Sequence, residues 1–352
     1  MTEKKVLSST KLSCVFRYQD NHVMKMLSRK AAEHELQVTS TLRCVDPTGD
    51  YTVYPLPKLY YPKAIEIAPR CEHHIGLVMP YGGVELMPSL VSDVFDTFLR
   101  VVYCLSRIKT AGILHLDLRL PNILVDDSKS GRRIRIIDFG ESIGTNYKEN
   151  INRWIGELFP PMLVENHYPP WFMIFLYKTS EMDEPETVRR LIENIYKEYS
   201  PELEIYNDKY IRGTDTDLIH KWLGMSTDDL WSQVVEPNLF KIDLYMFTNF
   251  LTNRVGTDIV SEDKKAILDA CMNPDPSKQL SVDDVLKSAK SVTGAQLQHN
   301  FDVLHHILHD FDSALSVSDN ATMLKEIGVM RQSLDVMQGL IRPLVITEAP
   351  LE

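Results

Sequence analysis

Two apolar segments of this chain each carry an aspartate near the centre, and this feature constrains the fold more than any other. The first segment reads HLDLRLPNIL over residues 115–124, and the second reads IIDFG over residues 136–140. A carboxylate in an apolar setting is costly unless a cation, a metal ion or hydrogen bonds compensate it. We therefore expect a cationic group close to Asp117 and Asp138.

The length and composition narrow the class of protein. A chain of 352 residues suits one enzyme built of two lobes with a terminal addition. No segment approaches the roughly 18 apolar residues that a membrane helix requires. Acidic residues exceed basic ones, 49 against 38, and the net charge of −11 argues against a general binder of phosphate backbones. We expect a soluble protein that binds neither a membrane nor nucleic acid.

The cysteines predict an intracellular protein with reduced thiols. There are five of them, scattered and odd in number, and the first residues, MTEKKVLSS, lack the apolar core of a secretory signal. Cys71 stands close to His73 and His74, but no second ligand pair follows at the spacing of a zinc site. A polar loop is the favoured interpretation of that stretch.

The pattern along the chain predicts an α+β fold. Strand-like stretches over residues 6–16, 22–27, 50–56 and 74–79 are interrupted by one helix at about 29–42. A long amphipathic helix then leads to Gly112, with its apolar face formed by Val91, Phe95, Phe98, Leu99, Val102 and Leu105. We expect a small sheet-rich lobe over 1–79, a linker at 79–86, and a larger helical lobe over 80–292.

The two aspartate segments match known motifs. HLDLRLPN follows the pattern H-R-D-L-x-x-x-N at every fixed position except the second, and DFG stands downstream. Over about residues 6–286 the chain resembles the protein kinase superfamily. Its MPYGG and YPP stretches resemble the divergent serine/threonine kinases of large DNA viruses. The resemblance implies a bilobal protein-kinase-like fold and a viral protein located in the cytoplasm of a host cell.

The resemblance also implies roles for individual residues in phosphoryl transfer. Asp117 orients the attacking hydroxyl and accepts its proton, while Arg119 neutralises charge on the transferring phosphoryl group. Asn122 holds a magnesium ion, and Asp138 bridges magnesium to the phosphates of ATP. The metal ions would then be the cations that the apolar segments require.

A lysine and a glutamate are expected to complete this set. HVMKML places Lys25 in the register of the V-A-I-K strand, whose lysine contacts the phosphates of ATP. Its partner on the following helix is expected to be Glu35, which precedes an apolar face. Glu33 is the alternative.

The phosphate-binding loop departs most from the family. Aligning Val15 with the valine of G-x-G-x-x-G-x-V puts Ser8, Thr10 and Ser13 where glycines are expected. A side chain forced into a left-handed conformation costs roughly 1–2 kcal/mol, which weakens ATP binding about five- to thirtyfold if binding bears it all. The adenine is expected against the linker, with Met79 behind it and the Pro80 carbonyl and Gly82 amide facing it.

Further departures concern the helical lobe. Trp171 and Gln279 stand where kinases carry a buried glutamate and arginine, so both partners of that pair are replaced together. Asp243 resembles the aspartate that binds the catalytic-loop backbone. Leu116 replaces the arginine that pairs with a phosphate, and this predicts an activation segment ordered by packing and independent of phosphorylation. The packing residues are expected to be Ile143, Trp154, Ile155 and Leu158.

Two additions to the kinase pattern are expected to be helical. An insertion occupies about residues 172–238, and it is either a spacer or part of a substrate-docking region. Two amphipathic stripes over 293–352 predict a C-terminal helical hairpin.

The sequence thus predicts an enzyme that transfers the γ-phosphoryl group of ATP to a protein hydroxyl. The serine/threonine preference rests on the viral resemblance alone. A pseudokinase that serves as an interaction scaffold is the alternative, motivated by the missing glycines and the missing arginine beside His115. A small-molecule kinase has no distinguishing motif here. The substrate and the oligomeric state are not specified by the sequence.

Overall fold

The computed structural model describes residues 6–9, 13–18, 21–62, 75–126, 133–144, 146–158, 168–179, 216–257 and 260–290. The chain divides into two compact units, Met1–Asp283 and Asp284–Glu352, and the described part of the second, residues 284–290, is helical. The expected C-terminal hairpin, residues 180–215 of the insertion, and the Cys71 stretch lie outside the described residues.

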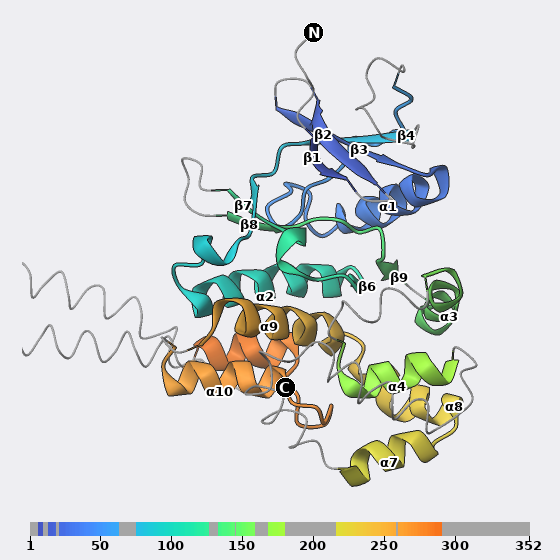
Figure 1. The fold of residues 1–352 in the computed structure, drawn as a ribbon, viewed down its shortest axis with the longest axis vertical. Coiled ribbons are helices and arrows are strands. Elements are labelled where there is room, and N and C mark those ends of the chain that lie inside the picture. The colour runs from blue at the N-terminus through green and yellow to red at the C-terminus, as the bar shows by residue number, and fades with distance from the viewer. Residues whose placement is uncertain are drawn as a thin grey trace, which may run out of the picture. The chain divides into compact units, whose positions relative to one another are not determined.

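The amino-terminal region is a four-stranded antiparallel sheet with one helix. Its strands are β1 (Val6–Ser9), β2 (Cys14–Tyr18), β3 (His22–Leu27) and β4 (Ile75–Pro80), paired in that order. Helix α1 (Arg29–Leu42) packs against β3 and β4 (Figure 1). The hydroxyl of Ser28 accepts a hydrogen bond from Ala31 N and caps this helix. The predicted bounds of the helix and of the strand at residues 22–27 are confirmed.

The strand predicted at residues 50–56 is wrong, because this stretch is a loop. Within it only Thr52 forms a bridge, to Ile136. The buried carboxylate of Asp46 instead accepts hydrogen bonds from the backbone N–H groups of residues 50, 51 and 52 and from the side chains of Thr52 and Tyr54. The three backbone N–H groups are donors that could otherwise pair with a neighbouring strand. The Asp46 carboxylate satisfies them instead.

Two small antiparallel sheets follow the linker. One pairs β5 (Val84–Glu85) with β7 (Ile123–Asp126) and β7 with β8 (Arg133–Ile136), and the other pairs β6 (Ile113–Leu114) with β9 (Ile143–Gly144). Short 3₁₀ turns occupy η2 (Pro88–Leu90) and η3 (Leu120–Asn122). Strands β4 and β5 thus take up much of the segment expected as a linker.

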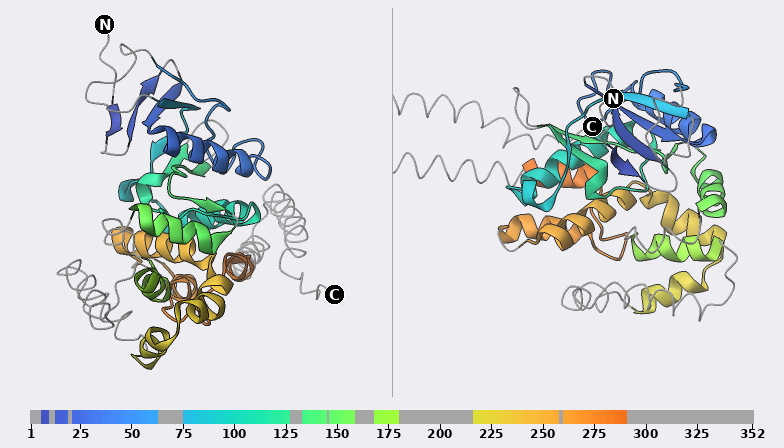
Figure 2. Two further views of the ribbon diagram at one scale, coloured as in Figure 1. Left: turned by 90° about the vertical axis from the view of Figure 1, so that its right-hand side faces the viewer. Right: turned by 45° about the horizontal axis from the view of Figure 1, so that its top comes forward.

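Helix α2 (Val94–Thr110) begins later than its apolar pattern predicted. The Asp93 carboxylate accepts from Asp96 N, which caps the first turn, so Val91 lies before the helix and the expected face loses that residue. The helix ends at Thr110, and Gly112 follows two residues later with a φ of 66°, which residues with side chains rarely adopt. Helix α2 packs against β8 and against α9 (Lys241–Val255) (Figure 2).

The described residues of the first unit after β9 are mostly helical. In chain order its elements are α3 (Tyr147–Leu158), α4 (Pro170–Thr179), α7 (Thr216–Gly224), α8 (Thr227–Leu230), the π-helical turn η4 (Trp231–Val235), the 3₁₀ turn η5 (Glu236–Asn238), α9, and α10 (Glu262–Cys271). The stretch STDDLWSQVV of the insertion is helical, as its pattern predicted. The fold is therefore mixed α+β, with small antiparallel sheets preceding a helical part.

Helix α4 contributes most of its residues to one apolar cluster. Its residues Trp171, Phe172, Met173, Ile174, Phe175 and Leu176 are all buried, so the helix is enclosed on every side. Trp222 of α7 and Leu230 and Trp231 at the end of the insertion belong to the same cluster. The described end of the insertion therefore supplies core. Among the described helices, none has the length and apolarity needed to cross a membrane.

Candidate functional site

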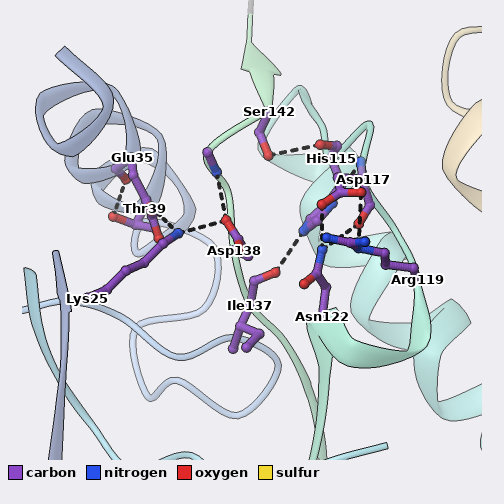
Figure 3. Close-up of polar contacts among 11 residues, drawn as sticks. Lys25, Glu35, Thr39, His115, Asp117, Arg119, Asn122, Ile137, Asp138 and Ser142 are labelled. Carbon is purple, nitrogen blue, oxygen red and sulfur yellow. Dashed lines mark hydrogen bonds and ion pairs between the residues drawn. The ribbon is translucent and has the colours of Figure 1, made fainter. Parts of the chain in front are cut away.

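Lys25 occupies the centre of a buried ion-pair cluster. Its ammonium Nζ lies 2.6 Å from Glu35 Oε2 on α1 and 2.7 Å from Asp138 Oδ1, which follows β8 (Figure 3). Burial disfavours the charged lysine, but Asp138 and Glu35 outweigh it and raise its pKa above the ordinary value. The expected partner is therefore present, whereas Glu33 lies 3.6 Å from Arg29 on the exposed face of the helix.

Asp138 is the member of this cluster that reaches solvent. Its side chain is 36% exposed, against 7% for Lys25. Burial alone would raise its pKa, but the Lys25 ammonium prevails and holds the pKa below the usual range, so the carboxylate stays ionised. Glu35 is fully enclosed, and burial raises the pKa of its carboxyl. The charge available for a ligand is thus that of Asp138.

Asp117 and Asn122 meet in the loop between β6 and β7. Asn122 Nδ2 donates to the Asp117 backbone oxygen at 2.7 Å and to Asp117 Oδ2 at 2.8 Å. Arg119 Nε lies 3.4 Å from Asp117 Oδ1, and its side chain is 39% exposed. Burial raises the pKa of Asp117, and Arg119 and His115 oppose that rise. A raised pKa makes this carboxylate a better proton acceptor.

Asp243 of α9 binds the backbone of the loop that carries Asp117, residues 115–124. Its two carboxylate oxygens accept from the backbone N–H groups of His115, at 2.7 Å, and Leu116, at 2.8 Å. This contact was predicted, and it is confirmed. Leu116 has a φ of 62°, a left-handed conformation that is costly for a branched side chain. Asp243 therefore holds the loop in a backbone conformation that it would not adopt by itself.

His115 connects this loop to the segment around Asp138. Its Nε2 lies 2.9 Å from the Ile137 carbonyl oxygen, and its ring packs edge-on against buried Phe139. The Ser142 hydroxyl donates to the His115 carbonyl at 3.2 Å (Figure 3). Asp138 has a φ of 66°, so the backbone turns sharply where its carboxylate faces Lys25. The segment that carries Asp117 and the segment that carries Asp138 are thus bound to each other through His115.

The residues expected to surround a nucleotide are only partly described. Ser8 pairs with Val15 across the β1–β2 hairpin, Ser13 is half-buried, and Thr10 lies outside the described residues. Met79 is buried in a cluster that Val15 and Leu124 also contact. The structure holds no nucleotide, so their roles stay predictions.

Pro80 and Gly82 lie on the chain that joins β4 to β5. Pro80 is exposed, whereas Gly82 is buried and its carbonyl oxygen accepts from Arg135. The Tyr81 N–H between them donates to the Asn21 carbonyl at 2.9 Å. The stretch expected to face an adenine is therefore bound at two points, the Tyr81 N–H and the Gly82 carbonyl.

The described part of the segment after Asp138 makes apolar and hydrogen-bonding contacts with the rest of the first unit. Ile143, Ile151 and Ile155 are buried with α4, while the side chains of Trp154 and Leu158 lie outside the described set. Ser142 is fully buried, and Tyr147 donates to the Gly112 carbonyl at 2.7 Å. Tyr168 donates to the Leu116 carbonyl at 2.7 Å. The described part of this segment thus contacts the loop of residues 115–124 through Ser142 and Tyr168.

Trp171 and Gln279 are both buried, as expected of residues that replace an ion pair. Gln279 Nε2 donates to the Cys271 carbonyl at 2.9 Å and to the Lys241 carbonyl at 3.3 Å. Trp171 Nε1 and Gln279 Oε1 have no hydrogen-bond partner among the described residues, so these two side chains do not bond to each other. The predicted compensation between them stays a prediction.

Sequence reasoning missed three residues that hold the site. His34 Nε2 on α1 lies 2.7 Å from the Ser142 carbonyl, Asp46 organises the loop after α1, and Arg135 joins that loop to Gly82. None belongs to a motif. Their roles depend on contacts between distant segments, which no local pattern signals.

The oxygen atoms near Asp138 suit a hard cation. Within the described residues no group of three or more His, Cys, Asp and Glu side chains could hold a metal ion. The Asn122 amide nitrogen is bound to Asp117, which leaves its oxygen as the atom able to ligate, and Asp138 offers an exposed carboxylate. A carboxylate and an amide oxygen are ligands that Mg²⁺ accepts when phosphates complete its shell.

Comparison with known proteins adds no assignment. No protein-family model matches this chain, and no curated protein sequence matches it.

Proposed function

We propose that this chain is an ATP-dependent protein kinase that phosphorylates serine or threonine hydroxyls of a protein substrate. The observation that carries the proposal is that four motif residues form two close pairs, one of which joins segments more than a hundred residues apart. Lys25 Nζ lies 2.7 Å from Asp138 Oδ1, and Asn122 Nδ2 lies 2.8 Å from Asp117 Oδ2. Phosphoryl transfer requires such positioned charges and little covalent chemistry from the protein.

The proposal includes a bilobal protein-kinase-like arrangement. Strands β1 to β4 with α1 would form the small lobe, and the helices from α2 onward would form the large one, joined at residues 79–86. The Lys25–Glu35 pair supports this assignment, because it places the lysine of β3 beside the helix and beside Asp138. So does Asp243, which binds the backbone of the loop that carries Asp117.

Each side chain has a definite part in the proposed reaction. Asp117 accepts the proton of the substrate hydroxyl. The hydroxyl oxygen bonds to the γ-phosphorus while the bond between that phosphorus and the departing ADP breaks. Lys25 binds phosphate oxygens, with Glu35 fixing its position. Arg119 stabilises negative charge on the transferring group. Asn122 and Asp138 would hold Mg²⁺, which when bound offsets charge on the phosphates of ATP.

A non-catalytic scaffold of the same fold is the second candidate, and one observation favours it. The β1–β2 hairpin contains no glycine, and Ser8 lies opposite Val15 in its register. Glycine normally permits the close approach of backbone N–H groups to phosphates. A scaffold would not need that approach, yet it would also not need Lys25, Asp117, Asn122 and Asp138 together.

A phosphorylation assay with γ-labelled ATP and Mg²⁺ on generic protein substrates tests the proposal. We expect incorporation by the wild type, and a loss of about 10²–10⁴-fold in Asp117→Asn, because this change removes the proton acceptor and nearly preserves the shape. Asp283→Asn is the matched control, since that carboxylate is exposed and pairs with Lys109. Equal incorporation by wild type and Asp117→Asn would contradict the proposal.

Thermal-shift titration with Mg-ATP separates the two candidates further. An active kinase is stabilised by ATP, and Lys25→Ala or Asp138→Ala removes that stabilisation because both lose a contact with the phosphates or the metal. No shift at millimolar ATP would favour a scaffold that does not bind nucleotide. A normal shift without phosphotransfer would favour a scaffold that does.

A further inference from the structure

Arg135 of β8 joins three segments that are distant in sequence. Its Nε donates to the Gly49 carbonyl at 3.0 Å, and its NH1 donates to the Gly82 carbonyl at 3.0 Å and lies 3.2 Å from Asp126 Oδ2. The side chain is 13% exposed. A guanidinium presents several donors in a rigid plane, so one side chain fixes both carbonyls at once.

The backbone at Gly82 and Gly83 is packed so closely that neither position has room for a side chain. A Cβ added at Gly82 would lie 2.4 Å from Val53 Cγ2 and 2.8 Å from Leu124 Cδ1. At Gly83, whose φ is 127°, a Cβ would lie 2.3 Å from the Val125 carbonyl oxygen. Without side chains these residues are intrinsically the most flexible in the segment, so their orientation depends on what binds their backbone.

The peptide group that carries the Gly82 N–H stands between two peptide groups that are each hydrogen-bonded. The Tyr81 N–H donates to the Asn21 carbonyl, and because a trans peptide is planar, the Pro80 carbonyl points the other way. The Gly82 carbonyl is fixed by Arg135. The Gly82 N–H therefore lies between two peptide groups whose orientations are both set.

We propose that Arg135 is a positioning residue for the nucleotide base, acting through the Gly82 peptide. The proposal rests on the proposed function, in which the Pro80 carbonyl and the Gly82 N–H face the adenine. Arg135 does not touch the nucleotide in this scheme. It keeps the Gly82 N–H pointing in one direction, and the loop organised by Asp46 holds Gly49 as the second anchor of the guanidinium.

Arg135→Lys tests this role against Arg133→Lys on the same strand. Both changes keep the charge, but Arg133 is 43% exposed and binds only a side chain, Asp50, at 3.3 Å among the contacts described. A lysine at 135 cannot reach two carbonyls in the geometry of the guanidinium fork. The measurements are nucleotide affinity and kinetics, and amide hydrogen exchange of the peptide covering residues 81–86 in the protein without nucleotide.

We expect Arg135→Lys to raise KM for ATP about tenfold, which corresponds to about 1.4 kcal/mol, with kcat changed less than about twofold. The preference for ATP over inosine triphosphate should shrink, because hypoxanthine lacks the exocyclic amine and carries a proton on N1. Exchange at residues 81–86 should become faster. Arg133→Lys should change none of these quantities.

Each result decides the proposal. Unchanged exchange at residues 81–86 in Arg135→Lys overturns the fixing of Gly82. Faster exchange with an unchanged preference between the two nucleotides overturns the positioning of the base. If the wild type binds neither nucleotide, the proposed function fails and base positioning fails with it, while faster exchange in Arg135→Lys would still establish a purely structural link between Arg135 and Gly82.

Discussion

The surroundings of Lys25 and those of Trp171 are both buried, but they satisfy their polar groups in opposite ways. The Lys25 ammonium is bound by two carboxylates within 2.7 Å. The cluster around Trp171 is apolar. The indole N–H of Trp171 has no hydrogen-bond partner in the part of the chain that the structure describes. The first region is held by directional contacts between charges, and the second by the packing of aromatic and aliphatic side chains.

The difference determines what each region tolerates. Removing one member of a buried ion pair leaves an uncompensated charge and costs roughly 3–5 kcal/mol. A buried N–H without a partner costs about 1–3 kcal/mol, and the packing of α4 offsets it. We therefore expect the region around Lys25 to be sensitive to the position of single atoms, and the region around Trp171 to be sensitive to charge and volume.

The largest effect is expected when a charge is placed in the apolar region. Trp171→Glu should lower the free energy of unfolding by about 3–5 kcal/mol, because nothing described in the cluster is cationic. Gln279→Arg alone should also destabilise, and the double change should recover part of the loss. Denaturant unfolding of the four proteins measures this double-mutant cycle.

Trp171→Phe serves as the control for that cycle. It removes the unpaired N–H and part of the volume but adds no charge, so a loss of only about 1–2 kcal/mol is expected. If the losses in the double variant are simply additive, Trp171 and Gln279 do not compensate for each other, and the comparison with an ion pair is wrong.

A smaller effect is expected when the directional contacts are broken at Asp243. Asp243→Asn keeps the shape, but its amide NH₂ would face a backbone N–H of residue 115 or 116. We expect a loss of about 2–3 kcal/mol in unfolding free energy, since one buried donor is left unpaired beside a left-handed Leu116. Stability within about 0.5 kcal/mol of the wild type would mean that the loop holds its conformation unaided.

Phosphorylation of the segment between the two regions should matter less. Ser142 is fully buried and Leu116 offers no charge to a phosphate, so activity should not depend on modification there. The triple variant Ser142→Ala, Thr145→Ala and Tyr147→Phe should keep most of the wild-type rate, as should phosphatase-treated enzyme. A fall of about tenfold or more, equivalent to about 1.4 kcal/mol, would refute packing as the source of order.

The smallest effect concerns the acid limb of the pH–rate profile. Burial raises the pKa of Asp117, and only its ionised form accepts a proton, so the rate should fall as the pH decreases through a value above the ordinary 3.9 or so. Arg119→Met removes a charge that lowers the pKa of Asp117, so the limb should move to higher pH.

Arg100→Met provides the comparison, because this exposed arginine pairs with Asp96 on α2. Its limb should coincide with that of the wild type. A limb that moves downward in Arg119→Met, or does not move, would show that another group controls the profile.

Features set by neighbours along the chain were predicted well. Helix α1 has its expected bounds because Ser28 caps it and its apolar residues repeat at helical spacing. Strand β3 follows from a run of six residues, four of them apolar, and the choice of Glu35 over Glu33 follows from the face of the helix on which each lies. The start of α2 was misplaced because Asp93 caps the helix after an apolar residue, Val91, that fits the same period.

Features that depend on contacts across the fold and that no motif signals were not predicted. Residues 50–56 have a strand-like composition, yet one carboxylate, Asp46, binds their backbone N–H groups and keeps them out of a sheet. In the sequence RIRI of β8, polar and apolar residues alternate, so Arg135 looks like an ordinary residue of the exposed face. Only the approach of Gly49 and Gly82 gives its guanidinium two carbonyls to bind.

The sequence by itself determined which residue types lie in the candidate site, because the spacing within HLDLRLPN and DFG places them in two short turns. Tertiary structure alone decided the distances between segments more than a hundred residues apart, such as Lys25 to Asp138 and His115 to Asp243. The physical reason is range. Periodicity and capping act over a few residues, whereas a buried charge requires a partner wherever the packed chain brings one.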